Sequence, residues 1–314
     1  MTTRTAIITG ASAGLGLECA RALLTSDPSW HVVLAVRDVA RGAQAVERIG
    51  YPGRCTVLEM DLASLRSVHT FAEDFRRRAL PPLHAIICNA GVQVVSGTER
   101  TVEGVEMTFG VNHLGHFALV KALLDDLAQP ARILVVSSGT HDPAKHTGMP
   151  SPRYTTAQEL AHPDASDSTD GRRRYTTSKL CNMLFTYELN RRLREGSGGV
   201  TVNAFDPGLM PGSGLARDYS AAGRWAWRYV FPLLRVLPNV NSTKTSGSRL
   251  AALASDPGFD DVTGAYFEGA RRIRSSVDSY DLQKALDLWE TSEQLLEEAE
   301  HNDQHGETRG RPAK

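Results

Sequence analysis

The sequence has few cysteines and no excess of charge of either sign, and each scarcity excludes a class of protein. Its four cysteines are scattered, with neither metal-ligand spacing nor a disulfide framework: Cys19, Cys55, Cys88 and Cys181. A reduced, cytoplasmic compartment fits this usage. The formal net charge is −1, with no separate basic half, so electrostatics gives no reason to expect a nucleic-acid partner.

Long hydrophobic runs are also missing. The N-terminus enters a strand-like run at 5–9, with no charged leader or export segment before it. The most apolar later stretch, 225–238, is interrupted by Arg228, Pro232 and Arg235, and it is shorter than the roughly 20 apolar residues that span a bilayer. We therefore expect no integral membrane segment.

Short apolar, β-branched runs alternate with longer amphipathic segments along the chain. One such segment, 15–25, places Leu15, Cys19 and Leu23 on one helical face. This alternation predicts an α/β, Rossmann-like, doubly wound parallel sheet of about seven strands with helices on both faces. The strands are expected at 6–9, 31–36, 55–60, 85–88, 133–137, 200–205 and 265–267.

The 314 residues are somewhat many for one domain, yet we expect a single domain over 1–300. A chain of this size buries enough surface to form a full hydrophobic core without disulfide bonds or structural metals. Two segments break the alternation. One is a polar insertion at 139–174, and the other is the charged tail 301–314, which is poor in large apolar side chains and is expected to be disordered.

A glycine-rich segment follows the first expected strand directly: Thr9-Gly10-Ala11-Ser12-Ala13-Gly14-Leu15-Gly16. Glycines at such a turn let backbone N–H groups approach a pyrophosphate, whose charge the helix N-terminus favours. A glycine cluster alone would fit an ordinary turn. This one lies between the first strand and the first helix, where a dinucleotide site requires it.

The end of the second expected strand indicates which dinucleotide binds. An NAD-selective site usually places a carboxylate there to hold the ribose 2′-hydroxyl. Val36 occupies that position and Arg37 follows. A guanidinium suits a 2′-phosphate, so NADP(H) is favoured. The alternative is a solvated arginine paired with Asp38.

With these features the sequence resembles the short-chain dehydrogenase/reductase family across roughly 4–270. The matching pieces occur in the family's order: Thr9-Gly-x-x-x-Gly14-x-Gly16, Asp61-Leu62, Asn89-Ala90-Gly91, Asn112, Ser137-Ser138, Tyr175-x-x-x-Lys179 and Pro207-Gly208. The resemblance implies that Asp61 holds the adenine, Asn89 steadies the central strands and Pro207-Gly208 lines the nicotinamide pocket. The expected cofactor-binding residues are therefore Thr9, Gly10, Ser12, Gly14, Leu15, Gly16, Arg37, Asp61, Leu62, Asn89, Ala90, Gly91, Tyr175, Lys179, Pro207 and Gly208, and no metal is expected.

The chemistry of the Tyr175–Lys179 pair can be argued independently. A tyrosine of unperturbed pKa near 10 is a poor acid–base catalyst at neutral pH. A lysine four residues later on a helix lies on the same face, and its positive charge stabilises the phenolate. Ser138 can hold the substrate oxygen, and Asn112 can anchor a water that leads protons to Lys179. The predicted reaction is hydride transfer between NADP(H) and a carbonyl or alcohol.

Other residues offer weaker candidates. Tyr280-x-x-x-Lys284 has the same spacing, but we expect it in an amphipathic C-terminal helix, serving packing and surface. His113 and His116 have the spacing of metal ligands on a helix but lack a third ligand, so packing is the better interpretation. His141 is expected either to touch substrate or to be a solvated loop residue.

Three segments narrow the resemblance to the branch that holds retinol dehydrogenases and light-dependent protochlorophyllide reductase: Asn112-His113-Leu114-Gly115-His116-Phe117, 178–184 and 60–65. The long gap between Ser138 and Tyr175 is also similar to that branch. Protochlorophyllide reductases usually carry cysteine after the Pro-Gly pair, where this chain has Leu209. This departure favours ketone or aldehyde reduction over ring reduction.

The segment at about 209–240 is expected to be a substrate lid. Its aromatic residues at 225–231 make a bulky apolar substrate plausible, with packing against the body or a partner subunit as an equal alternative. Membrane-surface docking is a weaker third option. A cofactor-binding sensor without turnover also stays open, as does the oligomeric state, with a homodimer or tetramer among the options.

Overall fold

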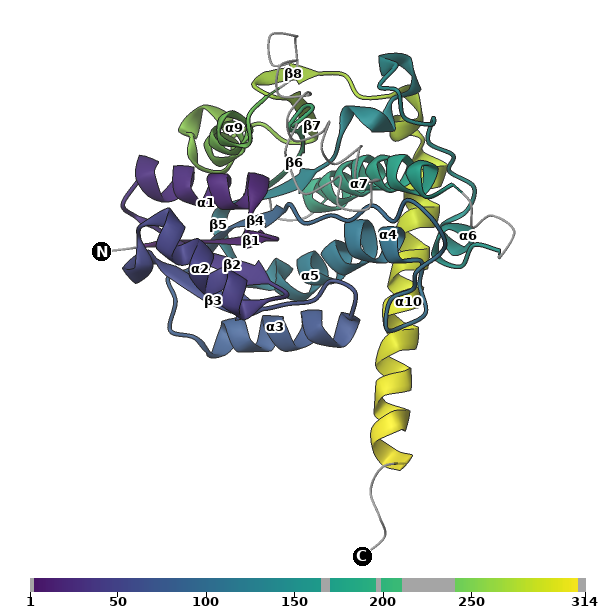
Figure 1. The fold of residues 1–314 in the computed structure, drawn as a ribbon, viewed down its shortest axis with the longest axis horizontal. Helices are drawn as coiled ribbons and strands as arrows, with labels where there is room; N and C mark the ends of the chain where they lie inside the picture. The colour runs from purple at the N-terminus through teal and green to yellow at the C-terminus, as the bar shows by residue number, and fades with distance from the viewer. Residues whose placement is uncertain (1–2, 165–169, 196–198, 211–240, 310–314) are drawn as a thin grey trace, which may run out of the picture.

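The computed structural model describes residues 3–164, 170–195, 199–210 and 241–309 (Figure 1). The expected lid therefore lies outside the described residues, except for its first two positions. The described strands form one eight-stranded sheet in the order β3-β2-β1-β4-β5-β6-β7-β8. The strands are β1 (Arg4–Thr9), β2 (Trp30–Val36), β3 (Cys55–Glu59), β4 (Leu83–Cys88), β5 (Leu127–Val136), β6 (Val200–Asp206), β7 (Ala265–Glu268) and β8 (Arg271–Ile273).

All seven expected strands are present, and the doubly wound α/β fold is confirmed. The first seven strands in the sheet order pair in parallel, so their carboxyl ends meet at one edge. The strand order reverses between β1 and β4, and ligands of such sheets bind outside that point. The additional strand, β8, pairs antiparallel with β7. It spans only Arg-Arg-Ile, which carries no hydrophobic pattern to predict a strand.

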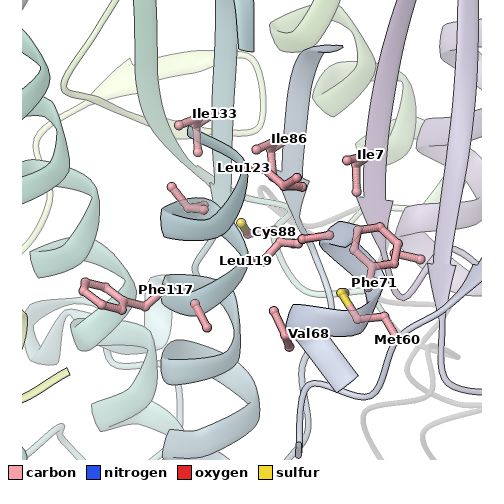
Figure 2. Close-up of a cluster of buried hydrophobic side chains, with 14 of the residues drawn as sticks. Ile7, Met60, Val68, Phe71, Ile86, Cys88, Phe117, Leu119, Leu123 and Ile133 are labelled. Carbon is pink, nitrogen blue, oxygen red and sulfur yellow. The ribbon is translucent and has the colours of Figure 1, made fainter. Parts of the chain in front are cut away.

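Helices cover both faces of the sheet (Figure 1). Along β1, Ala6 and Ile8 belong to the core beneath α1 (Gly14–Ser26), α2 (Val39–Ile49) and α9 (Thr243–Ser255). Ile7 belongs to the core on the other face, beneath α3 (Leu65–Arg77), α5 (Gly115–Leu123) and α7 (Gly171–Arg194). Figure 2 shows the second core, where Phe71 and Leu119 lie near Ile7. The helices are α1 (Gly14–Ser26), α2 (Val39–Ile49), α3 (Leu65–Arg77), α4 (Met107–Phe109), α5 (Gly115–Leu123), α6 (Ala157–Ala161), α7 (Gly171–Arg194), α9 (Thr243–Ser255) and α10 (Leu282–Arg309).

The C-terminal helix corrects one expectation. The helix α10 continues to Arg309 and projects away from the body of the protein, so 301–309 are helical rather than disordered (Figure 1). Only three of these nine residues are good helix formers (Gln304, Glu307 and Arg309), so local propensity does not explain the helix, which continues a helix already formed from Leu282 onward. Within the described part of the chain, no helix is long and apolar enough to cross a membrane.

Candidate active site

The glycine-rich segment forms a tight turn between β1 and α1. Gly10 and Gly14 have φ of 66° and 60°, a region that favours glycine. A Cβ on Gly16 would lie 2.6 Å from Asn89 Nδ2, so this glycine allows α1 to approach the strands closely, whereas a Cβ on Gly14 would meet open space. No side chain caps the N-terminus of α1. Its first N–H groups are therefore available to an anionic ligand.

Thr9 joins the two central strands at their carboxyl ends. Its hydroxyl accepts hydrogen bonds from the backbone N–H groups of Asn89 (2.9 Å) and Ala90 (2.8 Å). The Asn89 side chain donates to the Thr9 carbonyl at 2.7 Å. The segment Asn89–Gly91 is thus held beside the glycine turn, as the predicted role of Asn89 requires.

Another predicted cofactor residue, Arg37, lies at this same edge of the sheet. Arg37 is exposed immediately after β2, and the neighbouring Val36 is buried. The Asp38 carboxylate caps the first turn of α2 by accepting a hydrogen bond from Arg41 N at 3.0 Å. Asp38 therefore stabilises the start of this helix. Sequence reasoning missed Arg48, which donates to the Ser12 carbonyl at 2.6 Å and so braces the glycine turn.

Asp61 and Leu62 follow β3 and turn toward α5. The Asp61 carboxylate accepts from Ala63 N at 3.0 Å. Leu62 is buried, and its carbonyl would lie 2.6 Å from a Cβ on Gly115. Glycine at the start of α5 therefore lets this loop pack directly on the helix. Leu15, likewise buried, faces the core from α1.

The expected catalytic residues converge from β5, α7 and the segment before α5. Tyr175 and Lys179 lie one turn apart on α7, and the Lys179 ammonium nitrogen is 5.6 Å from the centre of the Tyr175 ring. Lys179 Nζ donates to the carbonyl of Val136, at the end of β5, at 3.2 Å. Ser138 follows two residues later and is half-buried, with its hydroxyl accepting from Thr140 N at 3.3 Å.

Burial controls the charge of Lys179. Loss of hydration lowers the pKa of its ammonium to about 8, and the nearby Asp206 carboxylate opposes the shift. Lys179 therefore still carries a proton at pH 7, within reach of the buried Tyr175 ring. A positive charge beside a phenol favours the phenolate, as the expected role of Lys179 requires.

Asn112 lies in a widened, π-helical turn, Gly110–Leu114, that leads into α5. Its buried side chain accepts from Val92 N at 2.7 Å and donates to both the Val92 carbonyl and Ser178 Oγ at 2.9 Å. These bonds use both amide protons and one lone pair of Oδ1. A Cβ on Gly91 would lie 3.3 Å from Asn112 Oδ1 and 3.6 Å from Lys179 Nζ, so both atoms flank Gly91.

The packing interpretation agrees with the structure for His113, whereas His116 also makes hydrogen bonds to Thr9 and Asn112. Each is buried, and burial lowers the pKa of His113 to about 3 and of His116 to about 4. His113 donates to Ser292 Oγ at 2.9 Å and packs among aromatic rings. Among the described residues, no group of three or more His, Cys, Asp or Glu side chains could hold a metal.

His141 matches neither of its two expectations. It is fully buried, donates from Nδ1 to the Ser138 carbonyl at 2.6 Å and accepts from Ser276 N at 3.2 Å. It therefore pins the turn that carries Ser138 instead of lying in solvent or offering a free nitrogen to substrate. The turn Gly139–His141 lies against α7 because tertiary contacts from 276 hold it there, which the sequence could not reveal.

The second Tyr-x-x-x-Lys pair lies away from this centre. Tyr280 ends a short turn, Val277–Tyr280, before α10 begins, so the pair is not within one helix as expected. Its ring stacks on Tyr187 at 4.9 Å, and Lys284 donates to Asp278 at 3.0 Å. These are packing and surface roles.

Pro207-Gly208 follows β6 at the same sheet edge. Gly208 has a φ of 76° and donates its N–H to Asp206 Oδ1 at 2.8 Å, while the Pro207 carbonyl accepts from Ser246 Oγ at 2.7 Å. Asp206 is buried, which raises the pKa of its carboxyl. Sequence reasoning missed this carboxylate because an acid before Pro-Gly has no motif of its own.

Two more residues near the site went unpredicted. Gln93 is 5% exposed, and neither its amide oxygen nor its amide nitrogen has a hydrogen-bond partner. Gly171 starts α7 so close to 94–95 that a Cβ would lie 1.8 Å from the Val94 carbonyl. Glycine at the first helical position, one turn before Tyr175, is the signal that could have identified this close approach.

The described residues line two cavities, which we compare with the expected catalytic residues. A cavity of about 320 Å³ begins at Thr140, two residues past Ser138, and is lined also by Asp142, His146 and Met149. A larger one of about 700 Å³ lies between α1 and α9, and none of the predicted site residues lines it. No predicted site residue lines the smaller cavity either, and its link to the centre is the turn that joins Ser138 to Thr140.

Known proteins resemble this chain in sequence and in fold. The profile described as short chain dehydrogenase matches residues 4–154. A protochlorophyllide reductase from Avena sativa is 36% identical over 316 residues, covering 92% of this chain and 98% of its own. A WW domain-containing oxidoreductase from Gallus gallus is 37% identical over 297 residues, covering 93% of this chain and 68% of its own.

Solved structures share the fold. An uncharacterized protein from Mycobacterium Paratuberculosis has a TM-score of 0.69 and 30% identity, with 94% of both chains covered. A blue fluorescent protein from a metagenomic library, solved in complex with NADPH, has a TM-score of 0.64 at 20% identity, covering 86% of this chain and 98% of that chain, and shows the fold alone. On the sequence relatives and the fold together, the chain belongs to the short-chain dehydrogenase/reductase family of oxidoreductases.

Proposed function

We propose that this chain is an NADP(H)-dependent oxidoreductase that reduces the ketone or aldehyde of a bulky apolar small molecule, or oxidises the corresponding alcohol. The observation that carries the proposal is the buried Tyr175–Lys179 pair, with the lysine ammonium held by Val136 at the carboxyl edge of the sheet. A buried ammonium beside a phenol is costly to maintain, and acid–base chemistry gives it a purpose.

The residues at the glycine turn fit a dinucleotide. The open space beside Gly14 and the uncapped start of α1 suit a pyrophosphate, and the exposed guanidinium of Arg37 suits a 2′-phosphate. Asp61, half-buried two residues after β3, suits the adenine end, and Pro207-Gly208 suits the nicotinamide end. When bound there, NADPH supplies a hydride to the substrate carbon.

The protein's own residues bind the carbonyl oxygen of the substrate and supply its proton. Ser138 donates a hydrogen bond that holds the substrate carbonyl oxygen. Tyr175 donates its phenolic proton to that oxygen as negative charge develops on it, and the Lys179 ammonium stabilises the phenolate left behind. Asn112 Oδ1 keeps one lone pair beside Gly91 and Lys179 Nζ, so it can anchor a water that returns a proton through Lys179.

The bulky apolar substrate class rests on the aromatic residues of the sequence. The cavity of about 320 Å³ begins at Thr140, two residues past Ser138 in the chain, and its lining includes polar groups such as Asp142, so it does not itself favour an apolar substrate. The aromatic residues at 225–231 in the sequence supply apolar surface close to the pocket motif along the chain.

A second candidate is reduction of a C=C bond, as in protochlorophyllide reductases. It is favoured by the 36% identity across 98% of the Avena sativa protein. Leu209 stands where those enzymes usually carry a cysteine after the Pro-Gly pair, and that departure places the second candidate below the first.

A panel of ketones, aldehydes and alcohols, followed by NADPH absorbance in the dark, tests the proposal. Protochlorophyllide with and without illumination belongs in the same panel. We expect turnover of a bulky carbonyl that falls by about 10²-fold or more in Tyr175→Phe, with folding and NADPH binding retained. Turnover of protochlorophyllide alone would establish the second candidate, and near-normal activity of Tyr175→Phe would refute the assignment of Tyr175. NADPH binding without turnover would indicate a sensor.

A further inference from the structure

The hydroxyl of Thr9 determines where the proton of a neighbouring histidine lies. A threonine hydroxyl has one proton and two lone pairs. Both lone pairs accept backbone N–H groups, from Asn89 at 2.9 Å and Ala90 at 2.8 Å. The remaining contact of Thr9 Oγ1 is His116 Nε2 at 2.9 Å, so the hydroxyl donates its proton to that nitrogen.

This donation leaves His116 with a single allowed state. Since Nε2 accepts, the neutral ring carries its proton on Nδ1. Nδ1 lies 3.2 Å from the backbone carbonyl of Asn112 and donates to it. Burial, with the positive charge of Lys179 adding to it, lowers the pKa of His116 to about 4, so the ring stays neutral at physiological pH.

The two bonds join two parts of the site. On one side is the hydroxyl that holds the glycine turn to Asn89 and Ala90. On the other is a carbonyl within the widened turn Gly110–Leu114, where the helical bond of Gly115 runs to Gly110 instead of to the residue four positions earlier. A side-chain donor inserted at such a turn stabilises its widened form.

We propose that His116 is a positioning residue that connects the dinucleotide-binding turn to the catalytic Asn112, with Nε2 securing the turn and Nδ1 securing the relay. This proposal rests on the proposed function. It predicts that the two nitrogens have separable effects, on cofactor affinity and on turnover respectively. A histidine that served only as packing would have no such division.

Glutamine and asparagine separate the two nitrogens. The glutamine amide in H116Q would reach the position of Nε2 and keep the bond to Thr9, so this variant should retain NADPH affinity and lose about five- to tenfold in turnover. The shorter amide in H116N would occupy the position of Nδ1 and keep the bond to Asn112, so this variant should retain turnover at saturating NADPH and bind NADPH about five- to tenfold more weakly. H116L should show both losses.

His113, three residues before His116, supplies a matched control. It is equally buried, but its bond runs to Ser292 in α10, and its Nδ1 has no hydrogen-bond partner. The variants H113Q and H113N should lower thermal stability without separating NADPH affinity from turnover. NADPH affinity is measured by its fluorescence, and turnover with 4-nitrobenzaldehyde as the carbonyl probe.

The outcomes are distinct. Equal losses of affinity and turnover in H116Q and H116N, tracking melting temperature as in the His113 pair, would overturn the proposal. Nitrogen-15 NMR of the wild-type protein gives a second arm that needs no variant, and we expect His116 protonated on Nδ1 from pH 6 to 8. An Nε2-protonated ring would also overturn it. If the wild type binds NADPH but reduces no carbonyl, the proposed function fails while the affinity and NMR arms still decide on His116.

Discussion

Lys179→Met should stabilise the protein while abolishing its activity. Burial lowers the pKa of the Lys179 ammonium from 10.5 to about 8. A difference of about 2.5 pKa units corresponds to roughly 3 kcal/mol of unfavourable free energy for burying the charge. Methionine keeps an unbranched apolar stem in the same space and removes the charge. The Val136 carbonyl keeps a second donor, Asn182 Nδ2 at 3.0 Å, so the substitution leaves it bonded.

The pH dependence of this gain follows from the direction of the shift. The folded state releases the lysine proton more readily than the unfolded state does. The penalty is therefore fully present below about pH 8 and disappears as the pH rises toward 10.5, where both states are neutral. At pH 7 the variant should be more stable than the wild type by up to about 3 kcal/mol, and this advantage should shrink at pH 9.5.

Urea unfolding of both proteins at pH 7 and pH 9.5 measures this difference. Lys145→Met is the matched control, because Lys145 is ion-paired with the half-buried Glu268 carboxylate and its loss removes that ion pair. We expect the control to lose stability at pH 7, the opposite sign. A Lys179→Met protein that is no more stable than the wild type at pH 7, or whose gain is the same at both pH values, would refute the reasoning.

Three further substitutions test other parts of the site. Arg37→Ala should weaken NADPH binding by roughly 10- to 150-fold and leave NADH affinity nearly unchanged, because only NADPH offers a 2′-phosphate. Titrations of both cofactors measure this, and equal losses of affinity would show that the arginine is structural. Gly171→Ala should lower the free energy of unfolding by about 1–3 kcal/mol, since its methyl group would overlap the Val94 carbonyl, and an unchanged denaturation curve would contradict the close approach. Gln93→Leu should raise the free energy of unfolding by about 1–2 kcal/mol, because it removes two buried polar atoms that lack partners. A loss of stability would show that Gln93 is hydrogen-bonded in solution.

The sequence alone was sufficient for the fold and for naming the candidate site residues. Continuous apolar runs such as 31–36 predict buried parallel strands, because a strand covered on both faces needs no polar side. Local patterns also singled out the glycine turn, Asn112, Ser138, Tyr175 and Lys179 as candidates, since each follows a strand or lies on a helix whose direction the chain order dictates.

Tertiary structure alone decided how these residues are held and charged. The lowered pKa of Lys179 depends on burial, which no local pattern reports. The roles of His116 and His141 depend on partners distant in sequence, Thr9 and Ser276, and only folding brings these together. The strand β8 exists because β7 offers it an edge, not because Arg-Arg-Ile favours extension. Sequence periodicity reports which face a residue occupies, whereas hydrogen-bond partners and hydration depend on the packing of distant segments.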